Sequence, residues 1–443
     1  MGLKEKVREN EAVICIVGVG FVGLPLSVEF AKAGFEVIGF DVDREKIKDL
    51  KLGIDPTKEI GSEELKRILN KYNLDFTDSP DVIKEADVVI ISVPTPIDES
   101  RKPILKYIKS ASQTVGKFLK KESVVVLESS VYPGVTEEVV KPIIEKESGL
   151  KCGIGFQLGY SPERINTGDK EHNLTKVVKV VSGCDNETTE LLAELYEKII
   201  KAGVYKAKDI KTAEAAKIIE NIQRDLNIAL VNELAIIFEK MNIDVNEVLE
   251  VAETKWNFHS YRPGLVGGHC IPVDPYYLVY KAKSLGYNPK IILSGRETNE
   301  YMPVHVANLV VENLKKKDKV PEKSTVLLLG LTFKKNVGDI RNCPSKTIIN
   351  ELKKHKIKIM GYEPLMPSDV LSKEFDIDIV KNFGDLEDRK IDCIILITEH
   401  DVFRDINIDK LRNIANDKPI LVDVKGFFDG NGVKKVGFEY VRL

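Results

Sequence analysis

The 443-residue sequence lacks the features that mark nucleic-acid-binding and membrane proteins. Its 66 Lys and Arg residues nearly balance 69 Asp and Glu residues, for a net charge of −3. Such a balance offers no extended positive surface, so we expect no nucleic-acid partner. The first residues are charged, without an apolar signal-peptide core, and no apolar run reaches the roughly 18 residues that span a bilayer. The sequence therefore predicts a soluble, cytoplasmic protein without a membrane partner.

Cysteine and histidine are scarce, with six of each. The cysteines are Cys15, Cys152, Cys184, Cys270, Cys343 and Cys393. None has Cys-x-x-Cys spacing, which argues against a zinc cluster or a disulfide framework. The histidines form no His-x-x-His or Glu-x-x-His pair, so we expect no metal. Most cysteines should be reduced and buried, so that one in a distinctive context would stand out.

Strands and helices alternate in the first half of the chain. Apolar, β-branched runs predict strands at 12–17, 35–41, 87–93 and 124–128, and an amphipathic helix covers 24–33. This alternation is typical of a doubly wound parallel sheet with helices on both faces. A chain of this length should form two or three domains.

The pattern becomes helical at Ile210 and continues without Gly or Pro to about Glu253, which predicts one long helix joining two domains. Strand-like runs then return at 325–330, 358–362, 392–397 and 419–423, after a polar candidate linker at 315–323. We therefore expect an α/β protein with two Rossmann-like doubly wound domains joined by a long central helix.

A glycine-rich hexapeptide at 18–23 follows the first strand and opens the first helix. Such glycines allow a tight turn, close approach of a pyrophosphate and packing of helix on strand. The expected cofactor contacts are Gly18, Gly20, Phe21, Val22 and Gly23. Asp41 ends the second strand, where a carboxylate can bind the adenosine ribose and would repel a 2′-phosphate. The combination favours NAD over NADP. FAD uses a similar motif, but no second flavin motif is present.

The later strands of this first sheet end in Thr95 and Ser130. Both would lie at the carboxyl edge of the sheet, where ligands bind in doubly wound folds. We therefore expect both residues to contact the cofactor, although ordinary strand-to-loop turns would give the same pattern.

The segment 264–275, Gly-Leu-Val-Gly-Gly-His-Cys-Ile-Pro-Val-Asp-Pro, sets Cys270 apart from the other cysteines. Two glycines precede the thiol, and Asp274 can lie one helical turn away or orient a partner of the thiol. A thiol with a pKa of about 8.5 needs a nearby cation to become a thiolate at neutral pH, and Lys217 is a candidate. The segment alone fits a packing cysteine equally well. We expect His269 to be structural.

Five segments in order resemble the UDP-glucose/GDP-mannose dehydrogenase superfamily, and within it the UDP-N-acetylhexosamine 6-dehydrogenases. They are 128–134 (ESSVYPG), 161–169 (SPERINTGD), 214–221 (EAAKIIEN), 267–274 (GGHCIPVD) and 333–341 (FKKNVGDIR). The resemblance spans nearly the whole chain. It implies an NAD-binding domain at 1–205, a helical dimerisation domain with the cysteine loop at 206–315, and a UDP-binding domain at 316–443. It also implies that substrate sits between the domains of a homodimer or higher homo-oligomer.

The resemblance implies roles for individual residues. Cys270 matches the nucleophile, Lys217 and Asn221 the groups that stabilise oxyanions, Asp274 the acid beside the cysteine, and Glu163 the carboxylate that activates water. Ser130 replaces a frequent Thr at a catalytic position and keeps its hydroxyl. The implied substrate contacts are Glu163, Arg164, Lys217, Asn221, Tyr261, Arg262, Gly264, Gly267 and Lys334, with Arg341 binding cofactor or UDP and Arg262 able to act across a subunit interface.

The chemistry also supports a covalent step, because an alcohol cannot become a carboxylate in one hydride transfer. Two NAD molecules must act in turn, and addition of a thiolate would hold the intermediate aldehyde as a thiohemiacetal. Loss of a second hydride gives a thioester, which water then cleaves. The resemblance therefore implies a four-electron oxidation at C6 of a UDP-N-acetylhexosamine.

The sugar is less well defined by the sequence. The run from His269 to Tyr277 resembles the N-acetylhexosamine branch, and Thr167 stands where UDP-glucose dehydrogenases often have a second Glu. Cys343-Pro344 replaces a usual Ser-Pro. UDP-N-acetylglucosamine is favoured slightly over UDP-N-acetylmannosamine, for use in surface polysaccharide or glycan synthesis. The alternatives are a UDP-glucose 6-dehydrogenase, a non-catalytic nucleotide-sugar-binding protein, and a hydroxyacid dehydrogenase using one NAD and no thiol.

Overall fold

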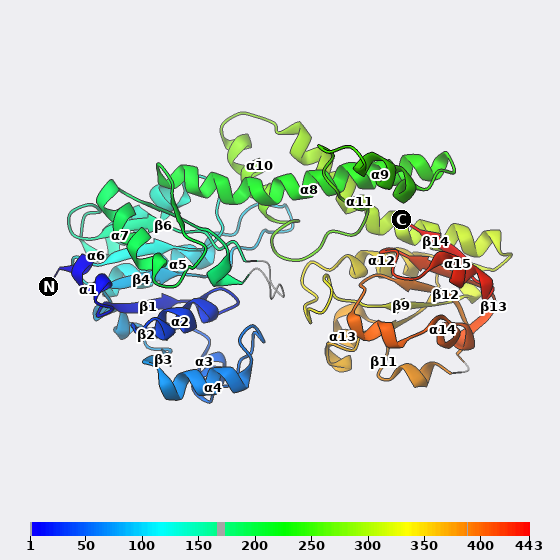
Figure 1. The fold of residues 1–443 in the computed structure, drawn as a ribbon, viewed down its shortest axis with the longest axis horizontal. Helices are drawn as coiled ribbons and strands as arrows, with labels where there is room; N and C mark the ends of the chain where they lie inside the picture. Colours follow the sequence, from blue (N-terminus) through cyan, green and yellow to red (C-terminus); the bar gives the residue numbers. More distant parts are fainter. Residues whose placement is uncertain (1, 166–172, 388) are drawn as a thin grey trace. The chain divides into compact units, whose positions relative to one another are not determined.

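The computed structural model describes residues 2–165, 173–387 and 389–443 (Figure 1). Thr167 and the rest of 166–169 therefore lie outside the described residues. The chain forms two compact units. The first comprises Met1–Glu220 with Tyr276–Tyr287, and the second comprises Asn221–Pro275 with Asn288–Leu443.

An eight-stranded sheet with the order β3-β2-β1-β4-β5-β6-β7-β8 forms the centre of the first unit. Its strands are β1 Val13–Val17, β2 Glu36–Phe40, β3 Leu74–Thr77, β4 Val88–Ile91, β5 Val124–Leu127, β6 Gln157–Tyr160, β7 Lys179–Gly183 and β8 Val204–Lys206. The first six strands are parallel and follow the strand order of dinucleotide-binding folds. β7 runs antiparallel to β6. The four strands predicted in this half are confirmed as β1, β2, β4 and β5.

The helices of the first unit pack on the faces of this sheet or beside it. They are α1 Leu3–Arg8, α2 Gly23–Lys32, α3 Arg44–Lys51, α4 Ser62–Lys71, α5 Lys106–Phe118, α6 Lys141–Ser148, α7 Asn186–Glu197 and α10 Asp274–Ser284. In β1, Ile14 and Ile16 are buried in a core shared with α2 and α7, while Cys15 and Val17 on the opposite face are buried as well. Successive side chains of a strand point to opposite faces, so a strand covered on both faces is a continuous apolar run.

The long helix ends earlier than the sequence predicts. α8 spans Ile210–Lys240, and a separate helix, α9, spans Val245–Glu253. Between them Asn242 has a φ of 56°, and the Asp244 side chain caps α9 by accepting a hydrogen bond from Asn246 N. Asn visits the left-handed region more readily than most residues, and Asp is a favoured N-cap. The prediction of one helix to about Glu253 is therefore wrong, because these two residues break it without Gly or Pro.

The second unit contains a six-stranded parallel sheet with the order β11-β10-β9-β12-β13-β14, again a dinucleotide-fold order. Its strands are β9 Thr325–Leu329, β10 Lys358–Tyr362, β11 Asp378–Val380, β12 Ile391–Leu396, β13 Ala415–Asp423 and β14 Glu439–Arg442. The four strands predicted here are confirmed as β9, β10, β12 and β13. The fold prediction, two Rossmann-like sheets and a central helix, is therefore confirmed.

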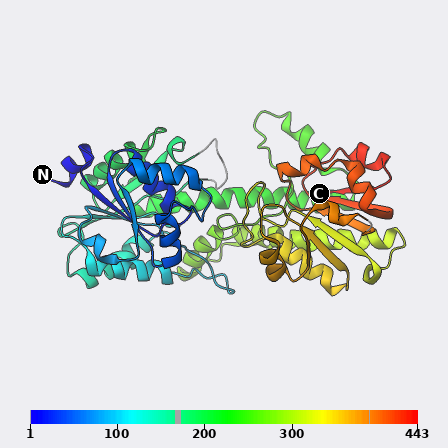
Figure 2. The ribbon, with the colours of Figure 1, turned by 90° about the horizontal axis from the view of Figure 1, so that it is seen from below.

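Two helical layers enclose this second sheet (Figure 2). α11 Lys290–Lys316, α12 Pro344–Lys354 and α13 Ser368–Phe375 pack on one face, and α14 Ile408–Ile414 and α15 Gly430–Lys435 on the other. α11 includes the first two residues of the candidate linker 315–323.

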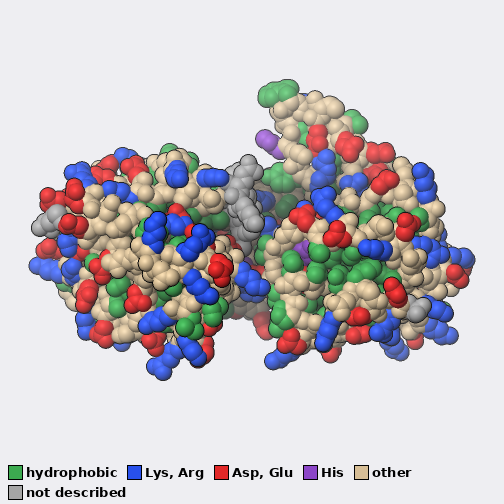
Figure 3. Space-filling model, turned by 60° about the horizontal axis from the view of Figure 1, so that its bottom comes forward, with side chains coloured by type: hydrophobic (Ala, Val, Ile, Leu, Met, Phe, Trp, Pro, Cys, Tyr) green, Lys and Arg blue, Asp and Glu red, His purple; other side chains and the backbone are tan. Residues whose placement is uncertain are grey.

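The surface carries both signs of charge. Figure 3 shows acidic and basic side chains interspersed on the visible face of each unit. No helix within the described ranges is long and apolar enough to span a membrane.

Candidate active site

The loop after β1 contains three glycines. Two of them occupy positions that tolerate no larger residue, and the third faces open space. Gly18 has a φ of 96°, and a Cβ there would lie 2.4 Å from Ser92 O. A Cβ on Gly23 would lie 1.9 Å from Gly18 O, whereas a Cβ on Gly20 would meet no atom within 4 Å. Gly18 and Gly23 thus make the turn and the close helix packing, and Gly20 leaves space for a phosphate to approach the backbone. The loop therefore fits a bound dinucleotide.

Replacing Gly20 with valine should weaken NAD binding without unfolding the protein. The added side chain would enter the space beside the loop and meet no protein atom at its Cβ. We expect the KM for NAD to rise at least tenfold, about 1.4 kcal/mol of binding free energy, with an unchanged melting temperature. Steady-state kinetics and thermal unfolding measure both, and an unchanged KM would contradict this position for the pyrophosphate.

The other residues of the expected cofactor site lie at the same sheet edge. Phe21 is exposed, and Val22 is the N-cap of α2. Asp41 is buried, and its carboxylate accepts hydrogen bonds from Val19 N at 3.1 Å and Lys46 Nζ at 2.8 Å. The carboxylate thus also holds the glycine loop in place, a role that the sequence did not predict.

Thr95 and Ser130 lie in loops that two other side chains hold. Ser129 Oγ accepts a hydrogen bond from Val93 N and donates one to Val93 O, at 3.0 and 2.8 Å, and Tyr277 OH donates to Thr95 O. Both Thr95 and Ser130 are half-buried. Ser130 was predicted from the sequence, but its neighbour Ser129, whose hydroxyl joins the two loops, was not.

Cys270 is exposed and begins the turn that becomes α10. Its carbonyl oxygen accepts hydrogen bonds from Val273 N and Asp274 N, the latter at 2.8 Å. The predicted one-turn spacing between Cys270 and Asp274 is therefore present. The positive end of a helix dipole favours an anion such as a thiolate. Three of the six cysteines are buried, so the expectation that most would be buried is wrong.

Asp274 contacts a second residue of the predicted catalytic set. Its side chain is 2% exposed, and Asn221 Nδ2 donates to Asp274 Oδ2 at 2.6 Å. α8 supplies Asn221, and the turn after Cys270 supplies Asp274. The structure thus joins the long helix to the cysteine turn through two residues that are 53 positions apart.

Lys217 lies one turn before Asn221 on α8, so both side chains leave the same face of the helix. It is 7% exposed, and among the residues that the structure describes it has no hydrogen-bond or ion-pair partner. Buried lysines are usually paired with an acid. Within the described ranges this leaves the Lys217 amine available to interact with an anionic group.

Glu163 follows β6 and is fixed through one carboxylate oxygen. Its Oε1 accepts hydrogen bonds from Arg164 N and Ile165 N, both at 2.6 Å. Arg164 also bonds Glu220 of α8 at 2.7 Å and Val178 O at 2.7 Å. Within the described residues Glu163 Oε2 is buried without a hydrogen-bond partner. Arg164 thus ties the Glu163 loop to α8, a structural role beside its predicted substrate contact.

The glycines before Cys270 pack the loop tightly on the second unit's own residues. Gly264 N and O both bond the Asn232 side chain, at 2.8 and 3.0 Å. A Cβ on Gly267 would lie 2.7 Å from Pro344 Cδ and 2.8 Å from Phe333 Cβ. Pro344 belongs to the Cys343-Pro344 pair, and the buried Cys343 thiol still donates a hydrogen bond to Leu331 O, as a serine would. Packing alone thus explains why Gly267 is a glycine.

The remaining predicted contacts are placed less distinctively. Arg262 is exposed and bonds the Glu253 carboxylate with two nitrogens, which lowers the pKa of Glu253 to about 2. Tyr261 is half-buried against the core around α9. Arg341 forms an ion pair with Asp339 at 2.8 Å, and Lys334 is half-buried. The predicted contacts of these four residues with substrate or cofactor are therefore proposals.

His269, which the sequence predicts to be structural, lies beside residues of the 333–341 segment. Its Nε2 lies 3.7 Å from Asp339 Oδ2, and its ring meets Phe333 edge-on. Burial, and then the charge of Arg341, lowers the pKa of His269.

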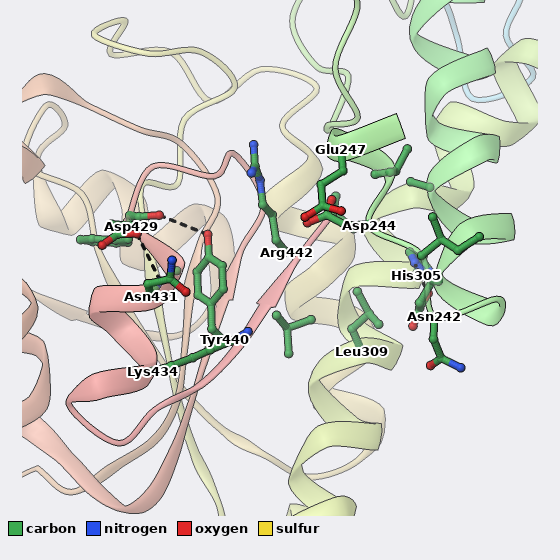
Figure 4. Close-up of a pocket in the computed structure, with 18 residues that line it drawn as sticks. Asn242, Asp244, Glu247, His305, Leu309, Asp429, Asn431, Lys434, Tyr440 and Arg442 are labelled. Atoms are coloured by element: carbon green, nitrogen blue, oxygen red, sulfur yellow. Dashed lines mark hydrogen bonds and ion pairs between the residues drawn. The ribbon is translucent and has the colours of Figure 1, made fainter. Parts of the chain in front are cut away.

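A cavity of about 520 Å³ lies elsewhere in the second unit, at the ends of α8 and β14 (Figure 4). Asp244, Glu247 and Arg442 lie on its wall, with His305 and Tyr440. None of the predicted site residues lines this cavity. Its mixed charges select no class of ligand.

Two sheets of dinucleotide-fold order, the three-glycine loop and Asp41 together define an NAD-dependent dehydrogenase of the Rossmann type. The chain belongs to the UDP-glucose/GDP-mannose dehydrogenase family. The NAD binding domain of that family matches residues 12–200, the central domain residues 211–301 and the UDP binding domain residues 327–430. The predicted family, enzyme class and cofactor are thus confirmed.

Individual relatives resemble the chain over nearly its full length. It is 46% identical to a UDP-N-acetyl-D-glucosamine 6-dehydrogenase from Salmonella typhi, over 94% of this chain and 96% of the relative. It is 30% identical to a UDP-N-acetyl-D-mannosamine dehydrogenase from Methanocaldococcus jannaschii, over 97% and 96%. The solved structure of a UDP-D-ManNAc dehydrogenase from Pyrococcus horikoshii superposes with a TM-score of 0.87 at 29% identity, covering 97% of this chain and 98% of that one.

Proposed function

We propose that the enzyme oxidises C6 of UDP-N-acetylglucosamine to the carboxylate in two steps, with Cys270 as the covalent catalyst. The observation that carries this proposal is the 2.6 Å bond between Asn221 and Asp274, one turn from the thiol. A hydroxyacid dehydrogenase with one oxidation step has no need for a thiol beside such a pair. Bound NAD would accept the hydride in each oxidation.

The protein residues would act in a fixed order. The Cys270 thiolate attacks C6 of the aldehyde, and the carbonyl oxygen becomes the oxyanion of a thiohemiacetal. Departure of the second hydride from C6 leaves a thioester on the sulfur. Glu163 then takes a proton from water as the water oxygen attacks the thioester carbon, and the carbon–sulfur bond breaks to release acid and thiolate.

Lys217 and Asn221 are suited to stabilise the oxyanion. They lie one helical turn apart on one face of α8, Lys217 without an ion-pair partner among the described residues and Asn221 as an amide that donates to Asp274. Donors fixed before the reaction stabilise developing charge more effectively than water does. The cost of burying Lys217 without an acid fits this role, because an anionic intermediate would supply the missing partner.

The N-acetylglucosamine assignment rests on the relatives. Identity to the glucosamine 6-dehydrogenase is 46%, against 30% to the mannosamine dehydrogenase, at similar coverage. These two substrates differ only in configuration at C2. We propose that the product, a nucleotide-activated uronic acid, supplies the synthesis of a polysaccharide or another glycan.

A substrate panel tests the choice of sugar. Purified enzyme would be given NAD with UDP-glucose, UDP-N-acetylglucosamine, UDP-N-acetylgalactosamine or UDP-N-acetylmannosamine, and NADP with the best of these. We expect kcat/KM to be at least tenfold higher for UDP-N-acetylglucosamine than for the others, about 1.4 kcal/mol of discrimination. A preference for UDP-glucose would instead make the protein a UDP-glucose 6-dehydrogenase.

A further inference from the structure

A buried lysine in the first unit has two acidic neighbours, Glu128 and Glu163. Lys179, the first residue of β7, is 3% exposed and donates to Glu128 Oε2 at 2.6 Å. Glu128 follows β5 and is 1% exposed, and its other oxygen accepts a hydrogen bond from Tyr196 OH of α7. Nothing in the proposed reaction uses these three residues.

The same lysine faces the proposed base. Lys179 Nζ lies 3.6 Å from Glu163 Oε2, the oxygen that lacks a hydrogen-bond partner among the described residues. Glu163 Oε1 is already held by two backbone N–H groups. Among the described residues, the charged and titratable groups around Glu163 are Lys179 of β7, Glu128 after β5, Tyr196 of α7 and the neighbouring Arg164, which is paired with Glu220 of α8.

The ammonium group of Lys179 thus lies close to two carboxylates, those of Glu128 and Glu163. Burial alone would lower the pKa of Lys179, but Glu128 and Glu163 together raise it. Burial raises the pKa of Glu128 to about 7, against the attraction of Lys179. An ionised Glu128 therefore attracts the lysine's charge, whereas with Glu128 protonated that charge acts mainly on Glu163.

We propose that Lys179 is a positioning residue whose charge stabilises the Glu163 carboxylate and orients it toward the attacking water, and that Glu128 sets the share of the lysine's charge that Glu163 receives. The inference rests on the proposed function, in which Glu163 activates water. A purely structural cluster would join β5, β7 and α7 equally well. The two roles differ in what they predict for pH dependence.

Two substitutions should move the pH profile in opposite directions. In Glu128→Gln the lysine's charge acts on Glu163 alone, so Glu163 should stay ionised to lower pH and be a weaker base. In Lys179→Met the buried Glu128 takes up a proton first, and Glu163 loses its nearest cation and protonates at higher pH. In the pH–rate profile of thioester hydrolysis, we expect the acidic limb to shift by about one pH unit, downward in the first variant and upward in the second.

The measurement is the decay of the covalent adduct after rapid mixing with UDP-N-acetylglucosamine and NAD, followed by intact-protein mass spectrometry between pH 5 and 9. The rate of adduct formation serves as an internal reference, and the KM for the sugar should change less than the hydrolysis rate. Lys6→Met is the matched control, since Lys6 pairs with Asp87 at 3.0 Å at the opposite, amino-terminal edge of the same sheet. Its acid limb should not move.

Several outcomes would overturn the inference. Unshifted limbs in both variants, or shifts of the same sign, would leave the cluster a structural one. If Lys179→Met does not fold, the isosteric Glu128→Gln alone decides, and an unshifted limb in that variant rejects the inference. Absence of any adduct in the wild-type enzyme would instead reject the proposed function itself, which keeps the two failures distinct.

Discussion

Replacing Cys270 with serine should lower carboxylate formation by at least about three orders of magnitude, the scale on which enzymes lose rate with their nucleophile. A serine hydroxyl at neutral pH is a much weaker nucleophile than a thiolate, so the aldehyde would not be held for the second oxidation. Uronic acid product, quantified by mass spectrometry, is the readout. Sugar binding should persist, because no step before aldehyde capture uses the sulfur.

Cys184 provides a matched control for this experiment. It is the other exposed cysteine, and a hydrogen bond with Cys152 lowers the pKa of Cys184 to about 6. Cys184 is thus an exposed thiol in the first unit that the proposed mechanism does not use. Cys184→Ser should leave the rate of acid formation unchanged. A near-normal rate in Cys270→Ser, or an equal loss in both variants, would contradict covalent catalysis by Cys270.

Replacing Glu163 with glutamine should slow release of the acid by about 10²- to 10⁴-fold, the usual contribution of a general base. Glutamine keeps the shape of the side chain and an oxygen that can accept the hydrogen bonds from Arg164 N and Ile165 N. It cannot take a proton from water. The preceding oxidation should continue, so that the protein accumulates a sugar adduct on Cys270, visible by intact mass and peptide mapping.

Lys217→Met offers the contrasting result. Loss of one oxyanion donor should slow oxidation by about 10²- to 10³-fold. Because that loss precedes thioester formation, we expect no adduct to accumulate. Slow acid release without an adduct in Glu163→Gln would place Glu163 at an earlier step than hydrolysis.

Buried apolar runs made the central strands predictable. β1, β4 and β5 are covered on both faces, so their sequences are almost purely apolar and stand out. The short strands β3 and β7 escaped prediction, since Leu74-Asp-Phe-Thr77 and a strand beginning with Lys179 mix polar and apolar residues. The break between α8 and α9 was missed because Asn242 and Asp244, rather than Gly or Pro, produce it.

The candidate site was predictable in part. The glycine loop and the turn between Cys270 and Asp274 are local in sequence, so their geometry followed from spacing. Contacts between distant segments could not be predicted from spacing, because the Asn221–Asp274 bond and the Lys179–Glu128 pair depend on the packing of separate elements. Lys179 did leave one signal, a lysine within the otherwise apolar run Val177-Val-Lys-Val-Val181, where burial of a charge requires a partner.

The ratio of NADH formed to sugar consumed tests the central claim most directly. A limiting amount of UDP-N-acetylglucosamine would be converted fully with excess NAD, with absorbance giving NADH and mass spectrometry identifying the product. Oxidation of an alcohol to a carboxylate on one enzyme predicts two NADH for each uronic acid and no free aldehyde. A ratio of one, with aldehyde as the product, would contradict the two-step covalent mechanism.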